Sequence, residues 1–454
     1  GKYLMTINGR YDGASNLGAG YRFGFFPGVS VGWNLHREEF WKALPEDLLT
    51  LKLRASYGEN GNISDLGDFQ AQGTYGVGNQ YFNNPAVLAT VFPNPDLRWE
   101  QSRTFDFGFD MGLFNRRVSV IFDYYNRITD DLLTDVALPG SSGFSVVRTN
   151  LGSLGNRGVE LELAAQVLSS ASPFQWNVSF NAARVKSKIL ELPANGIENN
   201  RVGGVLVWDA LRGDYVWKGG LQEGGRIGDM YSYRQIGVYA TDADAAKAPV
   251  DMIVPVSTAR PADGRIKYGG DVNWEDLDGN NIIDTRDQVY LGNPYPVWTG
   301  GFTNSFGYKN FNLYIRTDFA TGHTINDTGR SSADGQSQGD VMPTKEFIEK
   351  MWKKQGDITN TPRYLWQNQQ GNIARSSVYY QLGDYLALRE VTLSYAIPLA
   401  LLQKVKLSNF RLNLTGNNLH YFTKYKGLNP ETGGNDAASY PVSRNFTFGA
   451  NITF

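Results

Sequence analysis

The segment FDFGFDMGLFNRRVSVIFDYY, residues 105–125, decides the fold class. In its first half, Asp106, Gly108 and Asp110 alternate with an apolar row made of Phe105, Phe107, Phe109 and Met111. After a tight turn near Asn115, the second half repeats the pattern with an apolar row made of Val118, Val120, Phe122 and Tyr124. Successive side chains of a β-strand point to opposite faces. The segment therefore predicts a β-hairpin with one apolar face and one polar face.

The same alternation recurs at residues 159–163 and 174–181, with glutamates or amides on the polar face. Many such segments reach the roughly 9–11 residues that a tilted strand needs to cross a bilayer. Short connections near residue 115 and at 170–173, 308–310 and 398–407 alternate with long ones, which cover about residues 58–97, 130–154, 241–296, 320–383 and 417–442. Outer-membrane β-barrels have this arrangement, with short periplasmic turns and long extracellular loops.

Composition agrees with a barrel and excludes several other classes. The 454 residues include 51 glycines, 25 tyrosines, 25 phenylalanines and 10 tryptophans, and only 19% are charged, below the roughly 25% of soluble domains. A net charge of −2 argues against a nucleic-acid-binding protein. The absence of cysteine excludes a disulfide scaffold and a thiolate metal site. Composition alone still leaves a soluble β-sandwich or propeller open.

The last residues, RNFTFGANITF (444–454), form another alternating strand, whose apolar row is Phe446, Phe448, Ala450, Ile452 and Phe454. A final strand that ends on an aromatic residue resembles the signal by which outer-membrane barrels are recognised for insertion. We therefore predict an all-β chain, a transmembrane antiparallel β-barrel of the cell outer membrane, with residues 443–454 as final strand and insertion signal. One region does not fit: between residues 188 and 239 the up–down order requires an extra strand, which we place within 205–217.

Several strings resemble the SusC/RagA-like TonB-dependent receptors of the outer membrane of Bacteroidota. In family order they are YRFGFFPGVSVGWNL (21–35), LKLRASYGENGN (51–62), FDYYNRITDDLL (122–133), LPGSSGF (138–144), NLGSLGNRGVELEL (150–163), GNPYPVWTGGFTNSFGYKNF (292–311), DYLALREVTLSYAIP (384–398) and LTGNNLHYFTKYKGLNPE (414–431). Glycine, proline and aromatic positions coincide as well as hydrophobicity, so the resemblance is specific and covers nearly the whole chain.

The resemblance implies active nutrient import without covalent chemistry, and hence no enzyme. In the family, a SusD-like surface lipoprotein closes over the barrel and captures an oligosaccharide or oligopeptide, and the TonB–ExbB–ExbD machinery acts on a plug domain. The printed sequence opens directly on an alternating strand, so we expect the plug and the TonB box to be absent from this chain. We therefore expect residues 1–454 to be the C-terminal portion of the barrel, with roughly two-thirds of about 22 strands. The sequence does not indicate which residues contact substrate.

One segment carries metal chemistry: DLDGNNIIDTRD, residues 276–287, within the long extracellular loop 241–296. Calcium takes six to eight oxygen ligands, which the EF-hand loop supplies from alternate positions. That spacing predicts ligands from Asp276, Asp278, Asn280, the carbonyl of Ile282, Asp284 (directly or through water) and Asp287. Asn281 replaces the usual glycine, which is tolerable because Asn enters the left-handed region. We expect a structural calcium ion; the alternative is an acidic turn that binds nothing.

Other features are less specific. The aromatic stretches at 208–220 and 421–427 fit either ligand contact or packing within loops. The loop at 320–383 is also expected to be extracellular. Two further functions remain open at this point: a non-transport barrel that anchors or scaffolds other surface proteins, and a soluble glycan-binding β-protein.

Overall fold

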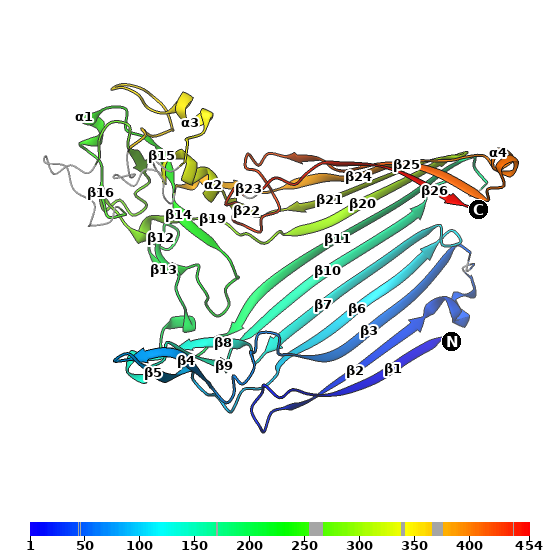
Figure 1. Ribbon diagram of the computed structural model, residues 1–454, viewed down its shortest axis with the longest axis horizontal. Helices are drawn as coiled ribbons and strands as arrows, with labels where there is room; N and C mark the ends of the chain where they lie inside the picture. The colour runs from blue at the N-terminus through cyan, green and yellow to red at the C-terminus, as the bar shows by residue number, and fades with distance from the viewer. Residues whose placement is uncertain are drawn as a thin grey trace.

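The computed structural model describes residues 1–43, 45, 47–168, 171–253, 267–336, 341–365, 376–438 and 440–454. Within these, twelve strands form one antiparallel sheet, curved into an open trough (Figure 1). In sheet order they are β1 (Tyr3–Gly13), β2 (Phe23–Asn34), β3 (Leu49–Asn62), β6 (Glu100–Leu113), β7 (Val118–Asp130), β10 (Ser153–Gln166), β11 (Phe174–Glu191), β20 (Trp298–Tyr308), β21 (Phe311–Thr321), β24 (Tyr385–Ala396), β25 (Asn409–Thr423) and β26 (Asn445–Thr453).

The register of the sheet gives it one apolar and one polar face, as predicted. Phe107 lies opposite Tyr124, and Phe109 lies opposite Phe122, with the two phenylalanine ring centroids 5.5 Å apart. On the other face, Arg54 of β3 donates to Asp110 of β6 and to Asp123 of β7. The apolar face is the outward one and the polar face lines the trough, so the sheet carries its apolar surface on the outside.

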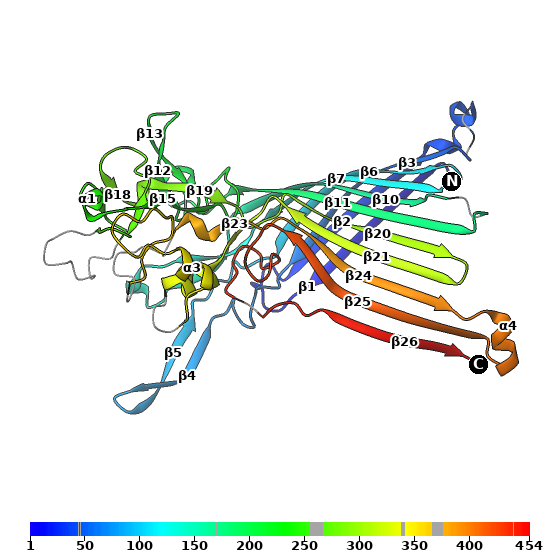
Figure 2. The ribbon, with the colours of Figure 1, turned by 90° about the horizontal axis from the view of Figure 1, so that it is seen from above.

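From β3 to β26, short and long connections separate to opposite ends of the sheet (Figure 1). Before β3 they do not, because residues 35–48 at the turn end form a longer connection than residues 14–22 at the loop end. At the turn end, Lys309 and Asn310 join β20 to β21, and the connection from β24 to β25 contains α4 (Leu399–Leu402). At the loop end, long segments form short pairs of strands outside the main sheet (Figure 2). The predicted alternation of turns and loops is confirmed for the connections from β3 to β26. No helix among the described residues is long and apolar enough to cross a membrane.

Beyond this end of the sheet the loop segments, together called the loop body, contain short pairs of strands. These are β4 (Thr74–Tyr81) with β5 (Asn84–Val91), β8 (Leu133–Ala137) with β9 (Val146–Asn150), β12 (Val205–Asp209) with β13 (Asp214–Lys218), β14 (Met230–Tyr233) with β19 (Gln288–Gly292), β15 (Gln235–Val238) with β17 (Val272–Trp274), β16 (Val250–Asp251) with β18 (Ile282–Ile283), and β22 (Thr324–Asn326) with β23 (Tyr380–Leu382). Three short helices accompany them: α1 (Asp242–Ala245), α2 (Thr328–Ser331) and α3 (Lys345–Lys350).

Among the described residues, the buried apolar clusters lie in this body and at its junction with the sheet. One contains Leu17, Leu66, Ala71, Leu97 and Leu133; another contains Tyr233, Val272, Trp274 and Ile283. The middle of the sheet instead exposes its large side chains, such as Phe105 at 48% and Phe107 at 43%. The loops therefore fold around cores of their own, while the sheet depends on an apolar solvent for its outer face.

Two expectations about strands are wrong. The extra strand expected within 205–217 does not enter the sheet, because β11 pairs directly with β20 and β12 pairs with β13 alone. The connection between the end of β11 at Glu191 and the start of β20 at Trp298 is thus longer than the expected 241–296 loop. The sheet also has twelve strands, fewer than two-thirds of about 22. The first error arose because the β12–β13 hairpin within the loop alternates like strands that cross the bilayer.

The final strand β26 pairs with β25 on one side and exposes its apolar row. Phe448 lies opposite Leu414, and Ile452 lies opposite Phe410, so this row shares the outward face. Phe446 is 73% exposed, and Phe454 follows the strand at 91%. The predicted strand is confirmed, and its role as insertion signal stays a prediction.

We expect Val120→Arg to damage membrane assembly, because the cost of an arginine on the lipid face rises from about 0–1 kcal/mol near the interfaces to about 2–4 kcal/mol at the bilayer midplane. Its chain neighbour Ser119 lies on the inner face opposite Gly112, so Ser119→Arg is the matched control and should assemble normally. The heat-modifiable gel shift and the yield from outer membranes measure assembly. Equal assembly of the two variants would contradict the assigned faces.

Replacing Phe446 and Phe448 together by serine, or deleting Phe454, should leave the protein degraded before insertion, since the exposed aromatic row of β26 would be lost. The paired change Thr447→Ser and Thr453→Ser on the inner face is the control and should insert normally. Surface levels measured by protease shaving test this. Normal levels of the phenylalanine variants would show that the row is not an insertion signal.

Candidate functional site

The acidic loop between β17 and β19 lies in the loop body and draws three carboxylates together. One carboxylate oxygen from each of Asp276, Asp278 and Asp287 lies within 4.8 Å of the other two. Asp276 accepts hydrogen bonds from the backbone N–H groups of Gly279 at 2.9 Å and Asn281 at 2.8 Å. Asn281 has φ of 60°, so it occupies the left-handed conformation that its place in the loop requires. The backbone therefore winds around the acids as the spacing predicts.

Asp287 is the buried member of this triad, with a relative exposure of 1%. It accepts from the N–H groups of Leu277 at 2.9 Å and Asp284 at 2.8 Å. Burial nevertheless raises the pKa of its carboxyl, and the charges of Asp278 and Asp276 add to the rise. A divalent cation among the three carboxylates would offset both the burial and the mutual repulsion.

The remaining predicted ligands are arranged differently. Asp284 forms an ion pair with Arg286 at 2.6 Å, and the hydrogen bond from Arg286 lowers the pKa of that carboxyl. The side chain of Asn280 donates to Asp278 at 2.9 Å and accepts from the N–H of Ile282 at 2.7 Å. Ile282 lies in β18, beside Val250 of β16. The structure thus gathers the three aspartates at positions 1, 3 and 12 and pairs Asp284 with an arginine.

Tyr215 joins this site from another part of the chain, and sequence reasoning missed it. Its hydroxyl donates to Asp278 at 2.5 Å, and this hydrogen bond raises the pKa of Tyr215. The guanidinium of Arg286 lies 5.4 Å from the centre of the Tyr215 ring. Tyr215 belongs to β13, within the aromatic stretch 208–220, so the β12–β13 hairpin rests on the acidic loop. The stretch was visible in the sequence, but a partner 63 residues away was not.

The inner wall of the trough has a second arrangement of charged groups. A β-bulge between β21 and β24 places Arg389 toward the inside, where its guanidinium donates to Asp318 at 2.9 Å and to the hydroxyl of Tyr421 at 2.9 Å. Arg389 also forms an ion pair with Glu431 of the loop after β25. Tyr421, the first residue of the aromatic stretch 421–427, is therefore part of the wall as a residue of β25. A recess of about 310 Å³ opens beside it, lined by Asn181, Gly301, Thr303, Arg316, Asp318 and Arg389.

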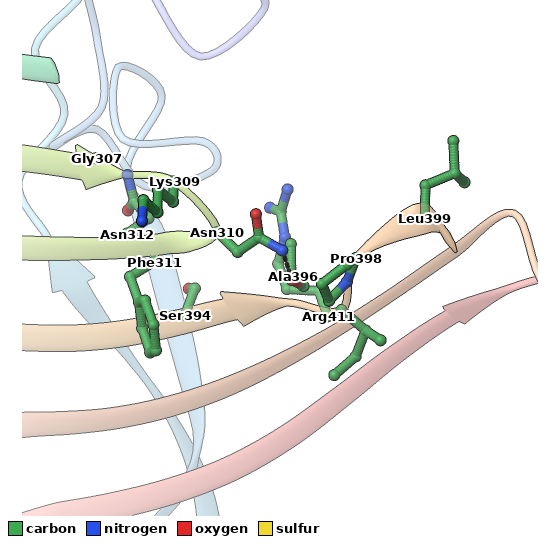
Figure 3. Close-up of a pocket in the computed structure, with 11 residues that line it drawn as sticks. Gly307, Lys309, Asn310, Phe311, Asn312, Ser394, Ala396, Pro398, Leu399 and Arg411 are labelled. Carbon is green, nitrogen blue, oxygen red and sulfur yellow. Dashed lines mark hydrogen bonds between the residues drawn. The ribbon is translucent and has the colours of Figure 1, made fainter. Parts of the chain in front are cut away.

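A larger recess of about 630 Å³ lies at the turn end (Figure 3). It arises because the β20–β21 turn has two residues whereas the β24–β25 connection is longer, so the rim has a step. Asn310 fixes that step by donating to the carbonyl of Ala396 at 2.8 Å. Lys309, Asn312, Ser394 and Arg411 line the recess, and Leu399 points away from them (Figure 3). The inner face thus offers polar recesses at two heights.

Comparison with known proteins agrees with this architecture. The family model described as TonB dependent receptor-like, beta-barrel matches residues 1–419. Two TonB-dependent receptors of Formosa agariphila are each 32% identical to this chain over its full length. The TonB-dependent receptor SusC of Bacteroides thetaiotaomicron is 28% identical, also over the full length. Among solved structures, the RagAB peptide transporter matches the whole chain with a TM-score of 0.78 at 23% identity, which supports the fold.

The chain spans less than half the length of these proteins: 45% and 44% of the two Formosa receptors, 42% of SusC and 46% of the matched RagAB chain. The resemblance to SusC/RagA-like receptors noted in the sequence is confirmed, and so is the expected outer-membrane location. The relatives are receptors and transporters, which are not enzymes. The chain belongs to the TonB-dependent receptors and forms part of their outer-membrane β-barrel.

Proposed function

We propose that this chain forms part of the wall of an active importer of nutrient oligomers, either oligosaccharides or oligopeptides. The observation that carries the proposal is the polar inner face, where charged groups are paired across strands and recesses remain between them. Arg54 bridges Asp110 and Asp123, and Arg389 bridges Asp318 and Glu431. Such a face keeps a conduit wet and offers hydrogen bonds to polar solutes.

The loop body is suited to bind a partner protein at the outer mouth of the barrel. It is folded around its own cores and tied to the wall through Arg389 and Glu431, so it presents a preformed surface above the conduit. We propose that a SusD-like lipoprotein docks there as a lid and that TonB–ExbB–ExbD supplies the energy. The matched structure is named a peptide transporter, which keeps oligopeptides among the candidate substrates beside oligosaccharides.

We expect Arg316→Gln to slow uptake several-fold without changing assembly. Arg316 lines the wall recess, is 52% exposed, and has its nearest ion-pair partner, Glu390, 3.8 Å away, so its donors face the conduit. Lys404→Gln, which removes an exposed cation at the turn end, is the control. Uptake of labelled oligosaccharides and oligopeptides by whole cells, with and without the proton-motive force, provides the measurement.

Loss of uptake on collapse of the proton-motive force would support active import, and co-purification of a surface lipoprotein would support the lid. A knockout that grows normally on every oligomer yet loses other surface proteins would contradict import. That result would favour the anchor or scaffold role instead.

We also propose a structural calcium ion at Asp276, Asp278 and Asp287. The three carboxylates converge, one of them is buried, and no lysine or arginine forms an ion pair with any of the three among the described residues. A calcium ion there would tie the acidic loop to the β12–β13 hairpin, because Asp278 already accepts from Tyr215. Asn280 and the carbonyl of Ile282 are close enough in sequence to provide further ligands. Asp284 could bind the ion only if its ion pair with Arg286 were broken.

Chelation should speed proteolysis of the 267–297 region and leave the sheet intact, since no hydrogen bond between sheet strands depends on the ion. Asp276→Ala with Asp278→Ala should reproduce the chelated pattern in the presence of calcium. Glu349→Ala, which removes an exposed carboxylate of α3 outside the triad, is the control. Limited proteolysis with mass-spectrometric mapping tests this in the full-length receptor.

The same experiment separates a metal site from an acidic turn. If chelator and calcium give identical cleavage of the wild-type loop, and elemental analysis finds no calcium, the loop binds no ion. Tyr215→Phe refines the outcome: with calcium bound, it should loosen the β12–β13 hairpin while the acidic loop stays protected.

A further inference from the structure

The outer face of β10 and β11 carries a group of cations at the loop end, which we term the outer basic patch: Arg157, Arg184, Lys186 and Lys188. The register sets Arg157 directly opposite Lys186, and Val159 opposite Arg184. Val159 and Leu161 belong to the apolar outward row, and side chains two residues apart share a face. All four cations therefore point outward, away from the conduit.

The patch begins where the apolar band ends. Below it on β11, the outward residues are Phe174, Trp176, Val178, Phe180 and Ala182. These cover about 26 Å of strand, or about 20 Å of height at a tilt of about 40°, near the roughly 25 Å of an outer-membrane apolar band. The guanidinium of Arg184 lies 5.5 Å from the ring centre of Trp298, and tryptophan marks the membrane–water boundary. The patch thus stands at the level of the outer-leaflet headgroups.

The part of the chain that the structure describes places no carboxylate in an ion pair with these cations. Arg157 donates to the amide oxygen of Asn126 at 3.1 Å, and Arg184 contacts Trp298. Among the described residues, no ion pair joins any of the four to an acid, and Glu160 and Glu162 lie on the inner face. Two like charges directly opposite each other destabilise a pair of strands. The arrangement on β10 and β11 is therefore unfavourable without an external anion.

The same end of the sheet shows the contrasting case. On β3, β6 and β7, Arg103 lies opposite Glu59 and forms an ion pair with Asp130. Outward cations there are balanced by the chain itself. An unbalanced group occurs on β10 and β11, beside an aromatic and aliphatic surface that an acyl chain can cover.

We propose that the outer basic patch binds the phosphate groups of an anionic glycolipid in the outer leaflet. Phosphate oxygens accept several charge-assisted hydrogen bonds from arginine and lysine, and arginine binds them in a two-pronged geometry. A phosphorylated lipid satisfies the charges and also places its acyl chains along the Phe180 and Leu161 row. A free phosphate ion satisfies only the charges.

The test is lipid binding by the full-length receptor in detergent, measured by native mass spectrometry. The probes are bisphosphorylated lipid A, its dephosphorylated form and inorganic phosphate. Lys186→Gln should weaken binding of lipid A about fivefold and Arg157→Gln with Lys186→Gln about thirtyfold, the factors expected for one and two surface cations. Lys309→Gln with Lys404→Gln, at the opposite end of the barrel, is the charge-matched control and should bind like wild type.

A heat-modifiable gel shift confirms that each variant is folded before binding is compared. Equal affinity of wild type and the double patch variant for lipid A would overturn the proposal. Wild-type binding of the dephosphorylated form as tight as that of lipid A would also overturn it. Competition by inorganic phosphate at equal affinity would show an ion site without a lipid.

Discussion

The structure depends on hydrogen bonding between neighbouring strands in a medium that offers the backbone no other partner. Each exposed peptide group within a bilayer costs several kcal/mol, so strands must pair along their full length. The twelve-stranded ladder satisfies this for the interior strands, while β1 and β26 are paired on one side. In the membrane these two edges must meet further strands. The outward apolar row follows from the same constraint, because that face meets lipid and cannot fold over a core.

Because of this constraint, the outer face of the sheet has a different role from the inner face and the loop body. The middle of the outer face is uniformly apolar. Aromatic and basic residues that can contact lipid headgroups occur on this face only near the ends of the strands. The charged side chains that we propose to contact solutes or a metal ion lie on the inner face and in the loop body. Arg389 links them, since it sits in a bulge of the wall, holds Asp318 and Tyr421, and reaches Glu431 in the loop after β25. A bulge re-aims a side chain and disrupts the strand pairing only locally.

The sequence predicted the features that repeat and missed those that depend on a single distant partner. The hairpin at 105–125, the final strand and the spacing of Asp276, Asp278 and Asp287 follow from local periodicity, and the structure forms all three. The contact of Tyr215 with Asp278 joins two loops, and no local pattern encodes it. Asp284 was predicted to be a calcium ligand, but its carboxylate forms a salt bridge with the neighbouring Arg286. Residues 205–217 were wrongly assigned to the main sheet. Alternation of apolar and polar residues indicates that a strand pairs with another strand, but it does not indicate to which sheet the pair belongs.

The central claim is that one face of every sheet strand meets lipid and the other meets the aqueous conduit. The chain has no cysteine, so single cysteines can be introduced one by one along β7 from Val118 to Tyr124. Each is then treated in intact outer membranes with a water-soluble thiol reagent, and a spin label at the same position reports lipid contact. Positions 119, 121 and 123 should react with the reagent, while 118, 120, 122 and 124 should resist it and contact lipid. Uniform reactivity along the strand, or the opposite alternation, would contradict the account.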